Sequence, residues 1–189
     1  MNVSSFLNTS GNLTTFNGIK IQSCKVKKML PTEETIPATV VEFKYDSKQD
    51  LKALKAVGLL WEENHFCPPL LKILEELNQG RLRNVGYRLF AVTTQKNKFG
   101  KLNPDEILCL SMIKQHIDDS ADIKYIESKS FLPSFKNEYK YAGTVMLDAY
   151  KRMFKSLSLF PVDDEVVKFY LKNGFQFLKN GICKMFWNK

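Results

Sequence analysis

Short runs of β-branched and aromatic residues recur along the chain and predict strands. The run at 39–45, TVVEFKY, predicts the clearest one, because such side chains suit the pleated, half-buried surface of a sheet. Upstream, residues 19–23 alternate between apolar and polar side chains, which predicts a short strand or edge segment before Pro31. The first part of the chain is therefore expected to contribute strands to a sheet.

Two helices are expected after the strand at 39–45. Asp46 or Ser47 can cap the first, whose apolar side chains recur at helical spacing until Gly58 ends it. Prolines at 68–69 suit the first turn of the second helix, and its leucine-rich face continues to Gly80. Both segments thus have a start signal, an apolar face and a stop signal.

The rest of the chain alternates between strands and helices. A polar stretch with turn-forming Gly100 and the Asn103–Pro104 pair joins two apolar runs, which is the pattern of a hairpin. This order of elements fits only the mixed α/β class. Strands are predicted at 87–94, 107–113, 123–132, 156–160 and 181–187, and helices at 143–154 and 163–172.

The chain has 189 residues, 44% of them hydrophobic, which suits one compact domain with a buried core. Residues 1–17 are rich in Asn, Ser and Thr and predict a flexible N-terminal arm, so 18–189 are expected to form the single domain. No run approaches the roughly 20 apolar residues of a membrane span, and no secretory signal opens the chain. We therefore expect a cytoplasmic protein without a membrane partner.

The net charge of +8 favours anionic partners, because a basic surface raises their local concentration. The lysines are scattered rather than gathered in the stripe typical of nucleic-acid binders, and most are expected to be solvated surface. Four widely spaced cysteines and two histidines argue against a zinc site. His65 and Cys67 lie close in sequence, but they are expected to be a buried or loop pair, so no metal is expected.

The stretch at 139–147, YKYAGTVML, lies where a strand gives way to a helix. A helix N-terminus exposes unpaired N–H groups and the positive end of the helix dipole, and so it binds phosphate without side-chain charge. Gly143 allows close approach, and Lys140 stands just upstream, so this segment can cradle a diphosphate. Considered alone, the stretch is better explained as an ordinary helix start.

A second stretch, FYLKNGF at 169–175, ends the helix predicted at 163–172. Asn173 and Gly174 form a helix stop, and Phe175 returns the chain to the core. By itself, the stretch is also compatible with two aromatic side chains that end an amphipathic helix.

Together, the two stretches resemble the GNAT superfamily of acetyltransferases, in which a glycine-containing turn and helix grip coenzyme A and a Phe-Tyr-x-x-x-Gly-Phe signature follows. The resemblance covers 123–187 by motif and 39–113 only by the order of elements. It implies an α/β fold with a mixed sheet of about six to seven strands and helices on both faces. Of the family's turn pattern only Gly143 is kept, since Glu138 and Tyr141 replace an Arg or Gln and a Gly, and Asp163 replaces a frequent Asn.

The resemblance also implies an activity and its residues. The family moves an acetyl group from acetyl-CoA to an amine, and Tyr170 matches the position of the general acid that protonates the departing thiolate. Glu127 matches a general base in several relatives, although an exposed pair with Lys129 is an equal alternative. Backbone groups of Phe131 and Leu132 would hold the pantetheine arm. The diphosphate would be held by Lys140, Tyr141, Ala142, Gly143, Thr144 and Val145.

The acceptor is left open: it is an amine on a small molecule, a peptide or an aminoacyl group. Two alternatives stand beside the enzyme. One is a catalytically weak or inactive module that binds coenzyme A. The other is a nucleic-acid-associated protein, including an enzyme whose substrate amine is linked to tRNA. A homodimer is possible, as in relatives.

Overall fold

The computed structural model describes residues 18–189 except 45–46, 62–71, 73–74, 77–78, 80–85, 96–102, 132–137 and 179–182, and for Leu59 and Phe131 it describes the backbone alone. The expected arm at 1–17 lies outside the described residues. So does most of the expected helix from 68 to 80, within which Lys72, Glu75 and Glu76 are helical.

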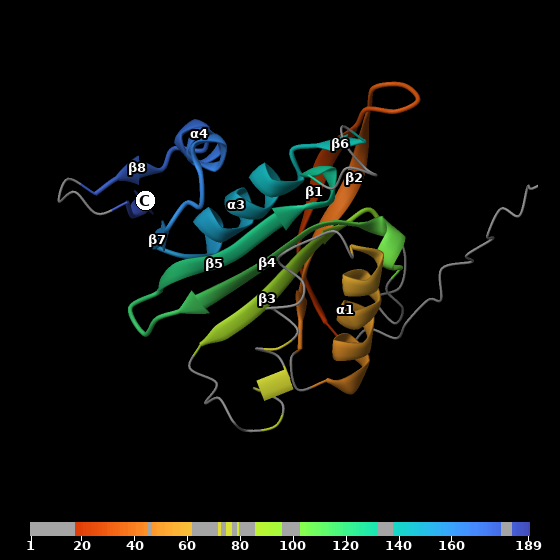
Figure 1. The fold of residues 1–189 in the computed structure, drawn as a ribbon, viewed down its shortest axis with the longest axis horizontal. Coiled ribbons are helices and arrows are strands. Elements are labelled where there is room, and N and C mark those ends of the chain that lie inside the picture. Colours follow the sequence, from red (N-terminus) through yellow and green to blue (C-terminus); the bar gives the residue numbers. More distant parts are fainter. Residues whose placement is uncertain are drawn as a thin grey trace, which may run out of the picture.

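The described residues form one mixed sheet of nine strands in the order β6-β1-β2-β3-β4-β5-β7-β9-β8 (Figure 1). All neighbouring strands are antiparallel except β5 and β7, which are parallel. The strands are β1 (Ile19–Lys28), β2 (Glu34–Phe43), β3 (Tyr87–Thr93), β4 (Ile107–Gln115), β5 (Ser120–Ser128), β6 (Tyr139–Lys140), β7 (Ser156–Leu159), β8 (Gln176–Phe177) and β9 (Met185–Asn188).

Helices cover both faces of the sheet, which confirms the expected mixed α/β class. The elements are α1 (Lys48–Leu60), α3 (Ala142–Met153), α4 (Asp164–Lys172) and two short 3₁₀ turns, η1 (Pro104–Glu106) and η2 (Lys129–Phe131). The sheet has more strands than the six to seven expected, because β6 and β8 are two residues each and leave no periodic signal in the sequence.

Two apolar cores lie on opposite faces of the sheet, because successive side chains of a strand point to opposite sides. On β2, Val40 belongs to the core beneath α3, whereas Val41 belongs to the core beneath α1. On β3, Phe90 belongs to the core beneath α3 and Ala91 to the core beneath α1. The core on the α3 side is the larger one and also contains side chains of α4.

Helix α3 is the crossover that joins the only parallel pair of strands described. After β5 the chain reaches β6 at the far edge of the sheet, and α3 then returns across the sheet to β7 (Figure 1). Its buried side chains include Met146, Leu147 and Tyr150, each with no exposed surface. The ends of α3 therefore lie at two distant places, beside β6 and beside β7.

The caps of α1 and α4 follow from local sequence. The Ser47 side chain accepts a hydrogen bond from the amide of Asp50 at 3.3 Å, and Asp163 Oδ1 accepts from the amide of Val166 at 2.8 Å. Gly58, however, does not end α1. The helix continues to Leu60, because the extra turn brings Trp61 into the core beneath α1. Trp61 is 1% exposed there, and its burial stabilises the turn.

Candidate functional site

The central feature of the site is a fork between β5 and β7. These strands pair only from Ser120 opposite Ser156 to Asp122 opposite Ser158. Strand β5 then continues to Ser128, whereas the last residue of β7 is Leu159. From 123 to 128, β5 has no strand on this side among the described residues, so the main-chain groups of that edge are open to a ligand.

A bulge marks the start of this open edge. Opposite β4, the register shifts between Met112, which faces Tyr125, and Ile113, which faces Ile123. Lys124 is therefore an extra residue on β5. A bulge bends a strand and increases its twist, and it thus helps to turn β5 away from β7.

The N-terminus of α3 offers free main-chain donors beside the far end of β5. Tyr141 precedes the helix in a left-handed conformation, φ 72°, and its side chain makes no capping hydrogen bond. The first helical hydrogen bond runs from the amide of Val145 to the carbonyl of Tyr141 at 2.9 Å. The amides of Ala142, Gly143 and Thr144 precede it and have no partner within the helix, which suits an anion.

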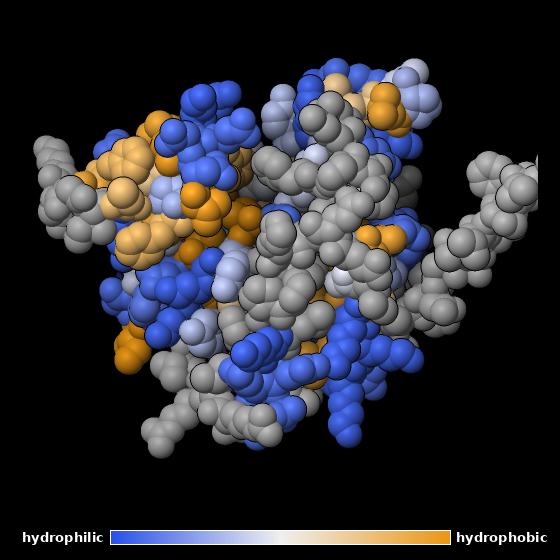
Figure 2. Space-filling model, viewed as in Figure 1, coloured by the Kyte–Doolittle hydropathy of each residue, from blue (hydrophilic) through white to orange (hydrophobic). Residues whose placement is uncertain are grey.

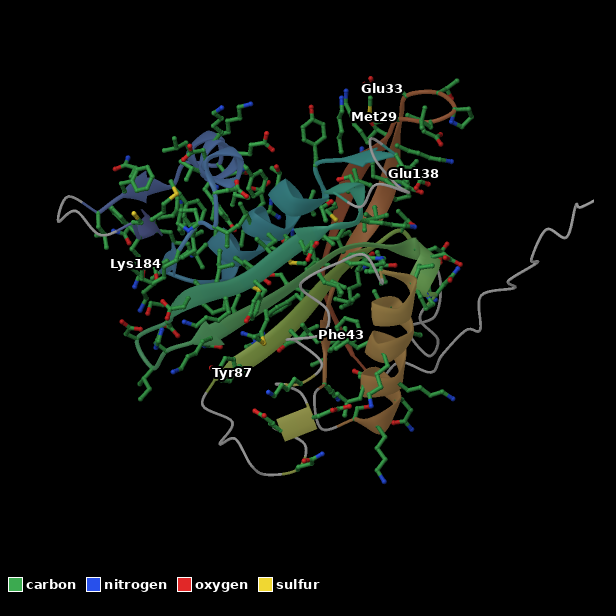
Figure 3. All side chains as sticks on the ribbon, in the orientation of Figure 1. Met29, Glu33, Phe43, Tyr87, Glu138 and Lys184 are labelled. Atoms are coloured by element: carbon green, nitrogen blue, oxygen red, sulfur yellow. The ribbon has the colours of Figure 1, made fainter. Side chains whose placement is uncertain are left out.

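Strand β6 fixes the segment that leads into α3. It pairs with the end of β1, where Lys140 lies opposite Lys27, and the amide of Met29 donates to the carbonyl of Glu138 at 2.8 Å (Figure 3). Lys27 forms an ion pair with Glu33, and Lys140 is exposed. Lys140 thus stands close to the start of α3 and adds positive charge to that of the helix dipole, whereas the charge of Lys27 is offset by Glu33.

Gly143 makes a close contact with α4. A Cβ at Gly143 would lie 3.1 Å from Cζ of Phe169, closer than side chains normally pack. Because Gly143 has no side chain, the Phe169 ring can pack against it. From the sequence alone, we expected this space to allow the close approach of a phosphate. The two motif segments are consequently in direct contact.

Tyr170 lies in the core on the α3 side and is 4% exposed. Its ring makes edge-on contacts with Phe169 and Phe175, with centroids 5.2 and 5.4 Å away. Burial raises the pKa of the Tyr170 phenol well above its ordinary value, and the nearby Cys109 thiol adds to the increase. The phenol therefore stays protonated across the physiological range.

Glu127 and Tyr170 approach the open edge from opposite faces of the sheet. Glu127 lies opposite Leu110, a member of the core beneath α1, and cross-strand partners share a face. Cys109, the neighbour of Leu110 on β4, belongs to the other core and interacts electrostatically with both Glu127 and Tyr170. Glu127 thus belongs to the open strand itself, on the face beneath α1, and Tyr170 belongs to the core on the opposite face.

The expected strand at 123–132 ends earlier, at Ser128, so the expectation for Phe131 and Leu132 needs correction. Phe131 lies in the turn η2 rather than in a strand, and Leu132 lies outside the described residues. Buried Lys129 donates from Nζ to the carbonyl of Asp105 at 2.8 Å, which draws the chain out of the sheet. The strand positions next to the fork are thus 123–128.

Two functional features could not be anticipated from the sequence. The contact between Phe169 and Gly143 joins two segments that lie 26 positions apart in the sequence, and no local pattern predicts it. The FYLKNGF stretch had indicated only that Phe169 belongs to a motif. The cluster around Asp122 and Ser158 arises where β5 meets β7 and has no signal in either segment. Only the pairing of the strands brings these residues together.

Two further properties bear on the site. Within the part of the chain that the structure describes, no three His, Cys, Asp or Glu side chains gather in a way that could hold a metal ion. The pair His65 and Cys67 falls outside that part. No helix of the described residues is both long and apolar enough to cross a membrane.

No protein-family model and no curated protein sequence matches this chain, but solved structures do. A GNAT-family acetyltransferase from Staphylococcus aureus Mu50 matches with a TM-score of 0.50 and 15% identity, over 80% of this chain and 98% of the other. The PaiA N-acetyltransferase from Thermoplasma acidophilum, in complex with coenzyme A, matches with a TM-score of 0.47 and 16% identity, over 80% and 99%. The match to the Staphylococcus aureus structure shows that the chain has the fold of the GNAT acetyltransferases, as its motifs predicted.

Proposed function

We propose that this protein transfers the acetyl group of acetyl-CoA to an amine. The observation that carries the proposal is the fork between β5 and β7, with uncapped amides of α3 at the outer end of its open edge. An open strand edge and a helix N-terminus together suit a ligand that has both amide groups and phosphates. Acetyl-CoA has both.

The chain's residues fit this co-substrate in two places. The amides of 142–144, with Lys140 close by, would hold the diphosphate. The open edge of 123–128 would hydrogen-bond the amides of the pantetheine arm, in place of Phe131 and Leu132. Acetyl-CoA itself supplies the acetyl group as an activated thioester.

Tyr170 and Glu127 divide the proton transfers. Attack requires a neutral amine, and Glu127 would accept its proton either directly or through a water molecule. Tyr170 would donate a proton to the departing sulfur, a role that requires a protonated phenol. Burial and the resulting high pKa favour that protonation state.

The decisive experiment measures thiol release from acetyl-CoA in the presence of a panel of amines. We expect saturable, amine-dependent release, and Tyr170→Phe should reduce turnover tens-fold or more, about the loss seen when an acid-base group is removed. Coenzyme binding should change little. Tyr87→Phe removes a hydroxyl from a distant tyrosine on β3 and is the matched control.

The possible outcomes separate the parts of the proposal. Coenzyme binding without turnover on any amine would indicate a binding module rather than an enzyme. Turnover that is equal in the Tyr170→Phe variant and the wild type would remove Tyr170 from the mechanism and leave acetyl transfer standing. Absence of coenzyme binding would overturn the proposal as a whole.

A further inference from the structure

A small cavity of about 90 Å³ lies at the closed end of the fork. Its size admits a single functional group rather than a whole substrate, since ligand sites usually exceed about 300 Å³. It begins where β5 and β7 separate, immediately beside the open edge proposed to hold the co-substrate. The cavity is lined by Asp122, Ile123, Lys124, Ser158, Leu159, Phe160 and Lys184.

Asp122 is the centre of a charged cluster in this cavity. Its Oδ1 accepts a hydrogen bond from Ser158 Oγ at 2.5 Å, and its Oδ2 faces Lys124 Nζ at 3.1 Å and His116 Nε2 at 3.3 Å. Burial alone would raise the pKa of Asp122, but the Ser158 hydroxyl and Lys124 lower it to about 2. The carboxylate is thus ionised and already surrounded by donors.

Lys184 contributes a second ammonium, which is near Asp122 but does not form a hydrogen bond with it. Its Nζ lies 3.9 Å from Asp122 Oδ1, which is too long for a hydrogen bond, and 5.7 Å from the ring centroid of Phe160. No other described residue forms a hydrogen bond with this Nζ. An ammonium has three donors, so Lys184 can bind an anion that enters the cavity.

The lysines that line the cavity therefore outnumber its carboxylate. Two lysines face one carboxylate. Phe160, 62% exposed, provides an apolar wall next to Lys184. Figure 2 shows apolar and hydrophilic residues side by side at this end of the molecule, and Figure 3 places Lys184 there, far from Glu138.

We infer that this cavity binds an anionic group, a carboxylate or a phosphate, of the acceptor whose amine is acetylated. The inference rests on the proposed function, because it places the acceptor beside the acetyl group at the fork. Lys184 and Lys124 would hold the anion, and Phe160 would cover the adjacent hydrocarbon. A second ammonium on the acceptor would be repelled by the positive charges of these lysines. Polyamines should therefore be poor substrates.

A matched series of acceptors tests this selectivity. 4-Aminobutyrate, butylamine and putrescine share a four-carbon amine and end in an anion, a methyl group and a cation, respectively. We expect kcat/KM to be at least about tenfold higher for 4-aminobutyrate than for butylamine, the effect of one charge-assisted hydrogen bond, and lowest for putrescine. 3-Aminopropyl phosphate compares phosphate with carboxylate. Equal values, or a preference for putrescine, would overturn the inference.

Variants localise the effect. Lys184→Gln should remove most of the preference for 4-aminobutyrate over butylamine, whereas Lys184→Arg should retain the preference. Lys155→Gln removes an exposed lysine outside the cavity and is the control. A preference that survives both Lys184→Gln and Lys124→Gln would show that the anion binds elsewhere.

A binding measurement keeps this inference separate from the catalytic proposal. Butyrate and inorganic phosphate are titrated into the full chain, and the amide resonances of Lys124, Ser158 and Lys184 are followed by NMR. Saturable shifts that Lys184→Gln abolishes would support the anion site even if no amine is acetylated. Acetyl transfer without such shifts, and without the preference for 4-aminobutyrate, would reject the anion site and leave acetyl transfer intact.

Discussion

The ring of Phe169 lies over the α-carbon of Gly143, so that an added Cβ would come within 3.1 Å of the ring tip. Phe169 belongs to α4 and Gly143 to the first turn of α3. The contact therefore joins the helix that carries Tyr170 to the helix whose amides face the proposed diphosphate site. It explains why the two motif segments occur together.

Gly143→Ala tests this contact. The new methyl group must displace the Phe169 ring, and crowding of this kind costs about 1–3 kcal/mol, which exceeds the gain of up to about 1 kcal/mol from replacing glycine in a helix. We expect a net loss of stability in urea unfolding. The same change in a Phe169→Leu background should cost less, by at least about 0.5 kcal/mol. Additive effects would mean that the ring and Gly143 are not coupled.

Tyr141→Gly should stabilise the protein. Tyr141 has φ 72°, a left-handed conformation that costs a residue with a side chain about 1–2 kcal/mol and glycine almost nothing. Tyr141→Ala is the matched control, because it removes the same ring but keeps the strained backbone. The glycine variant should unfold at a higher urea concentration than the alanine variant. The reverse order would argue against the left-handed conformation.

Stability at alkaline pH should depend on Tyr170. Its folded pKa is raised by burial, so its contribution is complete below the unfolded value of about 10 and is lost as the pH rises above it. Tyr170→Phe should therefore lose less stability than the wild type between about pH 10 and 12. Tyr150, fully buried with a raised pKa, should behave in the same way when changed to Phe. Parallel curves for wild type and variant would contradict the burial of the phenol.

Asp122 should make the free energy of unfolding depend on pH in the acidic range. Its folded pKa of about 2 lies below the unfolded value, so the contribution is present above about pH 4 and is lost as the pH falls toward 2. After allowance for solvent screening we expect about 1 kcal/mol. Asp122→Asn should lack this acid-dependent increment, whereas Asp148→Asn, on an exposed position of α3, should keep it. Chemical unfolding at pH 2 to 5 measures the difference.

Local signals account for much of the agreement between sequence and fold. Ser47, one of the two residues expected to cap α1, does so, because a side chain that accepts a hydrogen bond from an amide three residues later acts within one segment. The strand at 87–94 and the helix at 143–154 were placed to within one residue at each end. In these elements, periodicity and turn-forming residues agree.

Long-range contacts account for the rest. Strand β6 has two residues and exists because Lys140 pairs with Lys27, more than a hundred positions away. Strand β5 ends at Ser128, and the next residue, Lys129, bonds to the carbonyl of Asp105, a contact that no local pattern reveals. The two motif segments lie in direct contact, whereas the cavity at the fork followed only from strand pairing.

The most direct test of the central claim is an NMR titration of the full chain with acetyl-CoA. We expect saturable shifts of the amides of 142–144, at the start of α3, together with those of 123–128 along the open edge of β5. Desulfo-coenzyme A, which lacks the thioester, should shift the same amides. Binding whose shifts avoid both segments, or no binding at all, would contradict the claim that the fork is a coenzyme A site.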